Sequence, residues 1–358
     1  MVQEPADPTR KVDTVYKAAV IGLGFIGAGD QVSGDAIGQK VENLDGTHAQ
    51  ALAAHTQVEL VAGSSRDEGR RQRFAERMNV KNTFSNWREM LRGEDIDIVS
   101  IATYTPWHAE IAIACAEAGV RAVICEKPIA TRISDALRVI DACRKHGVLL
   151  AVNHPRRWHP LWQSVRDEIQ EGTIGQISHL AIHWPSGRLG NFGTHMFDAV
   201  SMLLGSGPDA VSGTLDSCVP PDCRGPDFHD PGGWGIVRFD NGVRVHVDAS
   251  TSVRLPLSFR IVGSLGWIDV GEETANVHPW TGQTRTITCP PDRPSSLANA
   301  VDEIVGCLSS GRDVCSTGDS ARKALEVVVG FHVSSKLGGQ WVSLPLEGDE
   351  KELEVRIG

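Results

Sequence analysis

Short apolar runs alternate with segments of helical spacing through the first 150 residues of the chain. Each run is short enough to be a strand buried on both faces, and the segments between the runs have the length of helices. This alternation predicts an α/β domain, doubly wound around a parallel sheet, over residues 16–150. The expected strands lie at 17–22, 58–63, 96–102 and 122–125, and the expected helices lie at 47–55, 66–78 and 108–119.

The pattern changes in the second part of the chain. Residues 233–251 alternate apolar and polar side chains on both sides of Asn241-Gly242, a dipeptide typical of tight hairpin turns. Residues 258–270 continue this alternation. We therefore expect a second, α+β domain over residues 151–358. The helices expected to close it lie at 296–311 and 319–335.

A glycine-rich turn follows the first strand and reads Gly22-Leu23-Gly24-Phe25-Ile26-Gly27. In a G-x-G-x-x-G of this kind the first glycine permits a tight turn, the second lets the backbone approach a pyrophosphate, and the third lets a helix pack closely on the strand. The position after a strand favours a dinucleotide site formed by Gly22, Gly24, Phe25, Ile26 and Gly27. A turn that serves packing alone is the alternative.

The end of the second strand bears on the choice of nucleotide. The expected acidic residue that binds the adenosine ribose is replaced there by Ser64-Ser65-Arg66. Hydroxyl groups followed by a guanidinium can bind a 2′-phosphate, which a carboxylate would repel. Ser64, Ser65 and Arg66 therefore favour NADP, with NAD as the alternative if Asp67 or Glu68 binds the ribose.

Composition and charge narrow the class of protein. The chain has 358 residues, of which 41% are hydrophobic and 22% are charged, as expected for two globular domains. A net charge of −10 argues against nucleic acid or anionic membranes as partners. The sequence has no apolar run long enough to span a membrane, and residues 1–15 are polar, so we expect a flexible N-terminal tail and a cytoplasmic protein.

Two segments remain ambiguous from sequence. Residues 28–46 are polar and glycine-rich where a helix normally continues, and they form either a lid over the cofactor or a passive surface loop. Cys218, Cys223 and His229 belong to a proline-rich stretch. Because no second pair of ligands follows, we expect a long loop near the active-site mouth, with no metal. The other six cysteines are expected to be free thiols.

Several motifs together resemble one family. They are the glycine turn, the segment Thr103-Tyr104-Thr105-Pro106-Trp107-His108, Cys125-Glu126-Lys127-Pro128, and Arg156-Arg157-Trp158. In order and spacing they resemble the glucose-fructose oxidoreductase, inositol dehydrogenase and rhizopine-catabolism (Gfo/Idh/MocA) family, from about Lys17 to about Pro345. The resemblance implies a Rossmann domain followed by an α+β domain whose open, mostly antiparallel sheet supports a homo-oligomer, a dimer or tetramer. The active site is then expected between the domains.

The resemblance also implies roles for individual residues. Lys127 is expected to contact the reacting hydroxyl and the nicotinamide ribose, and Pro128 to set the peptide geometry that aims it, in trans or in cis. Thr103, His108 and Glu126 are expected to contact the cofactor. An ammonium group beside an alcohol favours the developing alkoxide and orients the carbon for hydride transfer.

A second signature runs from Asn191 to Asp198, and its fifth residue, His195, matches the family's proton acceptor. Asn191 stands where the family commonly has an aspartate. An imidazole can accept a proton near neutral pH without help, but asparagine cannot raise its basicity by charge. Asp198 could supply the missing carboxylate, or it could only stabilise its own helix.

The remaining expectations concern the substrate. Arg157 and Trp158 are expected to bind it together with Asn191 and His195, because guanidinium donors and an indole face suit a polyhydroxylated ring. The expected reaction is hydride transfer between nicotinamide and a ring carbon of a sugar, sugar derivative or cyclitol. The alternatives are a glycoside-cleaving enzyme that oxidises the ring transiently, and a non-catalytic sensor, against which Lys127 and His195 argue together. Other residues expected near the cleft are His154, Arg156, Trp184 and Arg188.

Overall fold

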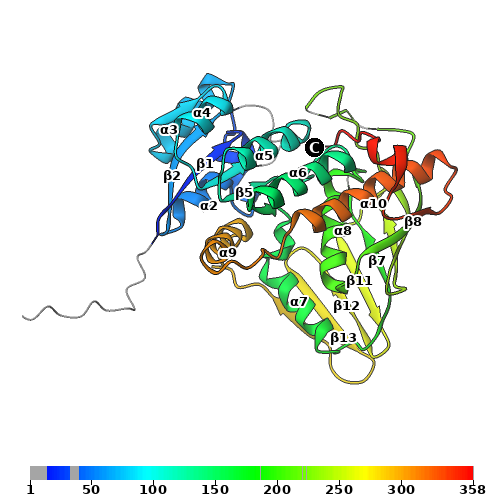
Figure 1. Ribbon diagram of the computed structural model, residues 1–358. Coiled ribbons are helices and arrows are strands. Elements are labelled where there is room, and N and C mark those ends of the chain that lie inside the picture. Colours follow the sequence, from blue (N-terminus) through cyan, green and yellow to red (C-terminus); the bar gives the residue numbers. More distant parts are fainter. Residues whose placement is uncertain (1–13, 33–39, 186, 220, 223, 358) are drawn as a thin grey trace, which may run out of the picture.

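Two β-sheets of different kinds organise the protein (Figure 1). In the computed structural model, the residues described are 14–32, 40–185, 187–219, 221–222 and 224–357. A six-stranded sheet is built from the first part of the chain and a nine-stranded sheet from the second. The α/β and α+β domains predicted from sequence are therefore confirmed.

The first sheet is parallel throughout and has the strand order β3-β2-β1-β4-β5-β6, which is the dinucleotide-binding arrangement. The four predicted strands are present, whereas β3 and β6 were not predicted. β3 is only three residues long, too short for a hydrophobic period to reveal it. The strands are β1 (Tyr16–Ile21), β2 (Val58–Ser64), β3 (Asn82–Phe84), β4 (Ile98–Ile101), β5 (Ala122–Cys125) and β6 (Leu149–Val152).

The helix after the glycine turn is short because the insertion interrupts it. Residues 33–39 of this insertion lie outside the described part of the chain. Thr47 caps the next helix by accepting a hydrogen bond from the N–H of Gln50. The helices around this sheet are α1 (Phe25–Ala28), α2 (His48–Ala54), α3 (Glu68–Met78), α4 (Trp87–Gly93), α5 (His108–Glu117) and α6 (Ile133–His146), with short 3-10 turns η2 (Val41–Asn43) and η3 (Thr105–Trp107).

The second sheet has the order β14-β13-β12-β11-β7-β10-β9-β8-β15, and only the pair β7 and β10 is parallel. The predicted hairpin forms between β9 and β10, and Gly242 takes the positive φ of 82° that its turn requires. The strands are β7 (Ile177–His183), β8 (Pro208–Leu215), β9 (Gly233–Phe239), β10 (Arg244–Asp248), β11 (Ser258–Gly263), β12 (Gly266–Val270), β13 (Thr274–Pro279), β14 (Arg285–Thr288) and β15 (Val342–Ser343).

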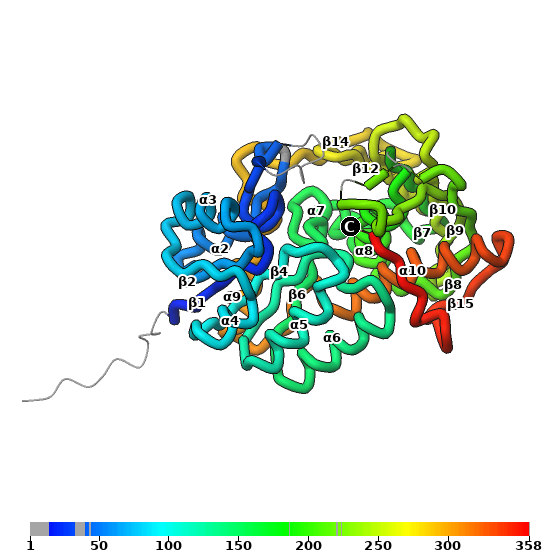
Figure 2. Tube along the Cα trace, turned by 90° about the horizontal axis from the view of Figure 1, so that it is seen from above, coloured from blue at the N-terminus to red at the C-terminus, as the bar shows by residue number. Residues whose placement is uncertain are grey.

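Helices of the second part of the chain cover this sheet on one face, except for α9, which packs beside α2 of the first domain (Figures 1 and 2). Among the described residues, no helix is long and apolar enough to cross a membrane. The helices are α7 (Pro160–Gln170), α8 (Asn191–Leu204), α9 (Ser296–Ser310) and α10 (Gly318–Lys336), with 3-10 turns η4 (Pro155–Arg157) and η5 (Gly348–Glu352).

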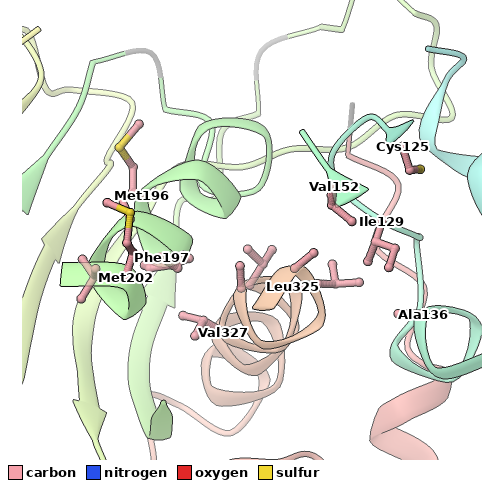
Figure 3. Packing of buried hydrophobic residues seen from close by; sticks show 14 of the residues in the cluster. Cys125, Ile129, Ala136, Val152, Met196, Phe197, Met202, Leu325 and Val327 are labelled. Carbon is pink, nitrogen blue, oxygen red and sulfur yellow. The ribbon is translucent and has the colours of Figure 1, made fainter. Parts of the chain in front are cut away.

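The two domains share one hydrophobic core, in which α10 is central. Figure 3 shows Leu325 and Val327 of α10 between Phe197 of α8 on one side and Ile129 and Val152 of the first domain on the other. All five side chains are buried. Burial of apolar area on both sides of α10 fixes the domains against each other. It therefore also fixes the junction between β5 and the start of α8, where the predicted site lies.

Candidate active site

The glycine turn after β1 has no room for side chains. Gly22 has a φ of 99°, and a Cβ there would lie 2.3 Å from the carbonyl oxygen of Ala102. A Cβ on Gly27 would lie 1.9 Å from the carbonyl oxygen of Gly22. The first and third glycines therefore have the tight-turn and close-packing roles that a dinucleotide fold needs. Phe25 is buried beneath the turn and Ile26 is half-buried.

The end of β2 presents hydroxyl and basic groups. Ser64 is buried, Ser65 is half-buried and the side chain of Arg66 is exposed. Arg71 donates from Nη1 to the carbonyl oxygens of Ser65, at 2.7 Å, and of Arg66, at 3.0 Å. Asp67 caps α3 by accepting the N–H of Arg70 at 2.7 Å. The nearest carboxylate is thus engaged with the backbone of its own helix, and Arg66 projects from the strand end toward solvent.

Glu126, at the end of β5, is held inside the protein. Its Oε1 lies 2.8 Å from Nε2 of His48 and accepts Nδ2 of Asn153 at 2.6 Å. Its Oε2 accepts the backbone N–H of Lys127 at 3.2 Å. Burial alone would raise the pKa of Glu126, but His48, Lys127 and Asn153 hold it at about 2. Glu126 therefore acts as a fixed anion that supports the backbone of Lys127.

Lys127 and Asn191 meet across the domain junction. The ammonium Nζ donates to the backbone oxygen of Asn191 at 3.2 Å and also to its side-chain Oδ1. Burial lowers the pKa of Lys127 to about 8. Asp230 accepts the backbone N–H groups of Gly190 at 2.6 Å and Asn191 at 2.8 Å, and burial raises its pKa to about 6. The start of α8 is thus fixed to the lysine from one side and to a carboxylate from the other.

His195 lies one turn after Asn191 on the same face of α8. Its Nδ1 is buried without a hydrogen-bond partner among the described residues. Burial, together with the positive charges of Lys127 and Arg156, keeps the pKa of His195 well below its ordinary value. His154 stands edge-on to His195, with ring centroids 5.8 Å apart. His195 is therefore a neutral imidazole with a vacant nitrogen beside Lys127.

Asp198 does not supply the carboxylate that Asn191 lacks. It accepts Nε of Arg157 at 2.8 Å and Nη2 of the same guanidinium at 2.9 Å, and it is fully buried. Burial alone would raise its pKa, but His154 and Arg157 hold it at about 2. The suggestion that Asp198 assists His195 is therefore wrong, because its charge is already matched by Arg157.

Arg157 and Trp158 direct their polar atoms into the protein. Arg157 also donates from Nη1 to the backbone oxygen of Cys315 at 2.8 Å, and Trp158 donates from Nε1 to Glu303 at 2.7 Å. These contacts join η4 to α8 and α9. Each side-chain nitrogen of Arg157 and Trp158 thus has an acceptor inside the protein.

His108 and Thr103 support the lysine segment from the β4 side. One ring nitrogen of His108 lies 2.7 Å from the backbone oxygen of Pro128, and the other lies 2.9 Å from that of Thr103. The peptide bond between Lys127 and Pro128 is cis. In this structure His108 positions the backbone on both sides of the site.

Some residues of the site were not found from sequence. His48 and Asn153 bind Glu126, and their roles depend on contacts between distant segments. Asp230 and Arg224 belong to the proline-rich stretch that was expected to lie near the active-site mouth, and the described part of that stretch does approach Lys127. The described residues contain no cluster of His, Cys, Asp or Glu suited to a metal. Cys223 lies outside those residues.

Comparison with known proteins identifies the family and agrees with the fold. Residues 16–154 match the family model described as an oxidoreductase family with an NAD-binding Rossmann fold, and residues 162–269 match the GFO/IDH/MocA C-terminal domain. Levoglucosan dehydrogenase of Pseudarthrobacter phenanthrenivorans is 28% identical over 72% of this chain and 67% of its own. D-apiose dehydrogenase of Paraburkholderia graminis is 25% identical over 90% of this chain and 88% of its own. The solved levoglucosan dehydrogenase complex with NADH and levoglucosan has the same fold, with a TM-score of 0.79 at 23% identity over 93% of this chain and all of that one.

Proposed function

The chain belongs to the Gfo/Idh/MocA family of oxidoreductases, as its motifs predicted, and from that premise we propose that it transfers a hydride between a nicotinamide dinucleotide and a ring carbon of a sugar, sugar derivative or cyclitol. One observation carries the proposal. The half-buried ammonium of Lys127 and the buried, unpartnered Nδ1 of His195 lie close to each other at the domain junction. The activities of the related sugar and inositol dehydrogenases support the substrate class.

Each of the two side chains has a distinct task in this reaction. Lys127 donates to the substrate hydroxyl, orients its carbon and stabilises the alkoxide that develops on oxygen. His195, neutral because of its burial, accepts the hydroxyl proton during oxidation and returns it during reduction. The dinucleotide, when bound at the glycine turn, supplies or accepts the hydride.

Asn191 changes the electrostatics of this pair. Its amide oxygen accepts a hydrogen bond from Lys127 but carries no charge. Asp230 is a carboxylate that raises the pKa of Lys127, and it is bound to backbone N–H groups at the start of α8. We propose that Asn191 fixes the ammonium without neutralising it, so that Lys127 retains its full effect on the alkoxide.

For the dinucleotide we propose NADP, bound through Ser64, Ser65 and Arg66 at the adenosine end. The engagement of Asp67 in capping α3 supports this choice, because one oxygen of that carboxylate already accepts the N–H of Arg70. Ser65→Asp should lower the ratio of kcat/KM for NADP to that for NAD on the order of tenfold or more. Arg66→Met should lower it by a similar factor, whereas Arg77→Met, on the far end of α3, should not. Unchanged ratios in the first two variants would show that Arg66 takes no part.

The function is tested by following reduced-nicotinamide absorbance while sugars, cyclitols and glycosides are added. A signal that requires added NADP or NAD and disappears in His195→Ala supports a dehydrogenase. A signal that appears without added cofactor and decays as a glycoside is cleaved would replace the proposal with transient ring oxidation. The absence of turnover with any polyol, together with sugar-dependent binding of another protein, would favour a sensor.

We also propose a cytoplasmic homo-oligomer, a dimer or tetramer. The strands of the nine-stranded sheet alternate buried and exposed residues, so one face of the sheet remains accessible. Trp234 lies on this face and is 56% exposed, so it offers apolar area to a second copy. Light scattering of the purified protein tests the assembly, and cell fractionation tests the location.

A further inference from the structure

Two arginines beside the active site share one carboxylate. Arg188, in the loop before α8, donates from Nη1 to Asp222 at 3.2 Å, and Arg224 donates from Nη1 to the same carboxylate at 2.9 Å. The side chain of Asp222 is only 3% exposed, and those of the two arginines are each 15% exposed. The three side chains therefore form a largely buried group with two positive charges and one negative charge.

This group lies at the domain junction, close to Lys127. The guanidinium of Arg224 lies over the ring of Phe228, and Phe228 meets Tyr104 edge-on with ring centroids 5.7 Å apart. Tyr104 follows β4 of the first domain, so the loop from the second domain reaches across the junction. Arg188 and Arg224 are also close enough to Lys127 to lower its pKa. Both guanidiniums thus lie near the ammonium that is expected to bind the reacting hydroxyl.

Both arginines retain donors that the protein does not use. Each binds Asp222 through Nη1 alone, and within the described residues Nε and Nη2 of neither side chain have an acceptor. The other carboxylates near Lys127 are already occupied, since Asp230 binds backbone N–H groups and Glu126 binds His48 and Asn153. A partly buried guanidinium with a free edge is suited to an oxyanion, which can accept two parallel N–H bonds.

We propose that Arg188 and Arg224 form a subsite for an oxyanion, so that the substrate is an acidic sugar or polyol, bearing a carboxylate or a phosphate. This inference rests on the proposed function, because Lys127 and His195 place the reacting carbon. The hydroxyl to be oxidised binds Lys127, and the acidic group binds the free edges of the two guanidiniums. Neutral sugars would leave these donors without an acceptor and would be used less efficiently.

The test compares matched substrates in the cofactor-loaded protein. Each acidic substrate is compared with the neutral alditol or aldose of the same configuration. The acidic substrates are the aldonates, uronates and sugar phosphates of the common pentoses and hexoses. An acid with kcat/KM on the order of 10- to 100-fold above that of its neutral partner is expected, since one charge-assisted hydrogen bond has that effect. Preference for carboxylates over phosphates, or the reverse, identifies the oxyanion. Equal or better use of the neutral partners throughout would overturn the inference and leave the dehydrogenase function standing.

Variants separate recognition from loop stability. Arg224→Met and Arg188→Met should each reduce the ratio of acid to neutral kcat/KM tenfold or more, while Arg224→Lys should retain part of it. Arg254→Met is the matched control, because Arg254 is exposed and, among the described residues, bonds to backbone oxygens of its own loop. Asp222→Asn should tighten binding of the acid, because it removes the competing anion. A loss of activity with every substrate in Asp222→Asn and Arg224→Met alike would assign the group to holding the loop.

Binding without turnover distinguishes the two proposals. Calorimetric titration with D-gluconate and with inorganic phosphate should show binding to the wild type and to Arg254→Met, and none to Arg224→Met. If this binding occurs but no polyol is turned over, the proposed function fails and the oxyanion subsite stands. If neither anion binds in an Arg224-dependent way and no acid is preferred, the subsite fails.

Discussion

Two clusters of buried and half-buried polar side chains lie next to each other at the domain junction, and α8 contributes to both. The first, which we call the joint cluster, consists of Arg157 and Asp198, whose side chains are joined by paired hydrogen bonds. The second, which we call the reaction cluster, consists of Lys127, Asn191 and His195. Among the described residues, the ammonium of Lys127 donates only to the neutral oxygens of Asn191, and Nδ1 of His195 has no hydrogen-bond partner. One cluster uses its hydrogen bonds to hold the fold, and the other keeps its groups available.

The pKa values are lowered in both clusters, but the lowering has opposite effects on the charged forms of an acid and of a base. In the joint cluster, neighbouring cations hold the pKa of Asp198 at about 2 despite its burial, so its charged form is stabilised. In the reaction cluster, burial lowers the pKa of Lys127 to about 8 and holds that of His195 well below its ordinary value, so their charged forms are disfavoured. Groups whose titration is displaced in this way are suited to exchange protons with a substrate.

The largest effect is expected in the reaction cluster. His195→Asn keeps a polar side chain of similar size but removes the proton acceptor, so kcat should fall on the order of 10²- to 10⁴-fold. Stopped-flow measurement of nicotinamide reduction would check this. The thermal unfolding midpoint should stay close to that of the wild type, because His195 makes no hydrogen bond that the fold needs. Activity within a few-fold of the wild type would exclude His195 as the base.

Substitutions in the joint cluster should lower the stability of the folded protein. Arg157→Met leaves Asp198 buried without its main partner, and the free energy of unfolding should fall by about 3–5 kcal/mol. Arg156→Met is the matched control, since burial lowers the pKa of Arg156 to about 10 and its buried Nε has no partner among the described residues. Removing that charge should cost less than about 1 kcal/mol. Denaturant unfolding of both variants measures the two changes in the free energy of unfolding. Equal decreases would contradict the structural role assigned to the joint cluster.

The sequence was sufficient for features that depend on local pattern. Apolar runs and the glycine turn predicted the parallel sheet, and the four-residue spacing of Asn191 and His195 predicted that they share a face of α8. Resemblance to a family identified Lys127. These features recur because strand period, helix period and turn geometry are properties of short segments.

Features that depend on tertiary contact could not be predicted. Asp198 is three residues from His195 in sequence, yet only the fold shows that η4 brings Arg157 to it. Arg224 and Asp230 lie near Lys127 because the loop before β9 crosses the domain junction. The hydrophobic periodicity of a segment does not predict such a long-range contact. Hydrogen-bond partners separated by many residues decide which charge is satisfied and which remains available. A polar residue in a motif therefore does not reveal its role until its partners are known.

A smaller effect is expected from the titration of Lys127. Its pKa in the folded protein is lowered to about 8 from an ordinary 10.5, and the protonated form is the one that stabilises the alkoxide. Activity should therefore be retained below pH 8 and fall about tenfold per pH unit above it, as the ammonium loses its proton. A profile of kcat/KM from pH 6 to pH 10 at saturating cofactor measures this limb. A flat profile up to pH 10 would show that the charge of Lys127 is not required.

The smallest expected effect is a displacement of that limb by Asn191→Asp. A carboxylate at this position would lie against Nζ of Lys127, where the neutral amide oxygen now accepts its hydrogen bond. An adjacent negative charge favours the ammonium, so the pKa of Lys127 should rise by about 1 unit or more, and the alkaline limb should move to higher pH by the same amount. The rate below pH 8 should fall slightly, because a neutralised ammonium stabilises the alkoxide less. Asn191→Ser is the control, since it is neutral and should leave the limb near pH 8. If Asn191→Asp and Asn191→Ser give the same limb, the charge state of the group beside Lys127 does not set its titration, and the reaction cluster would be governed by burial alone.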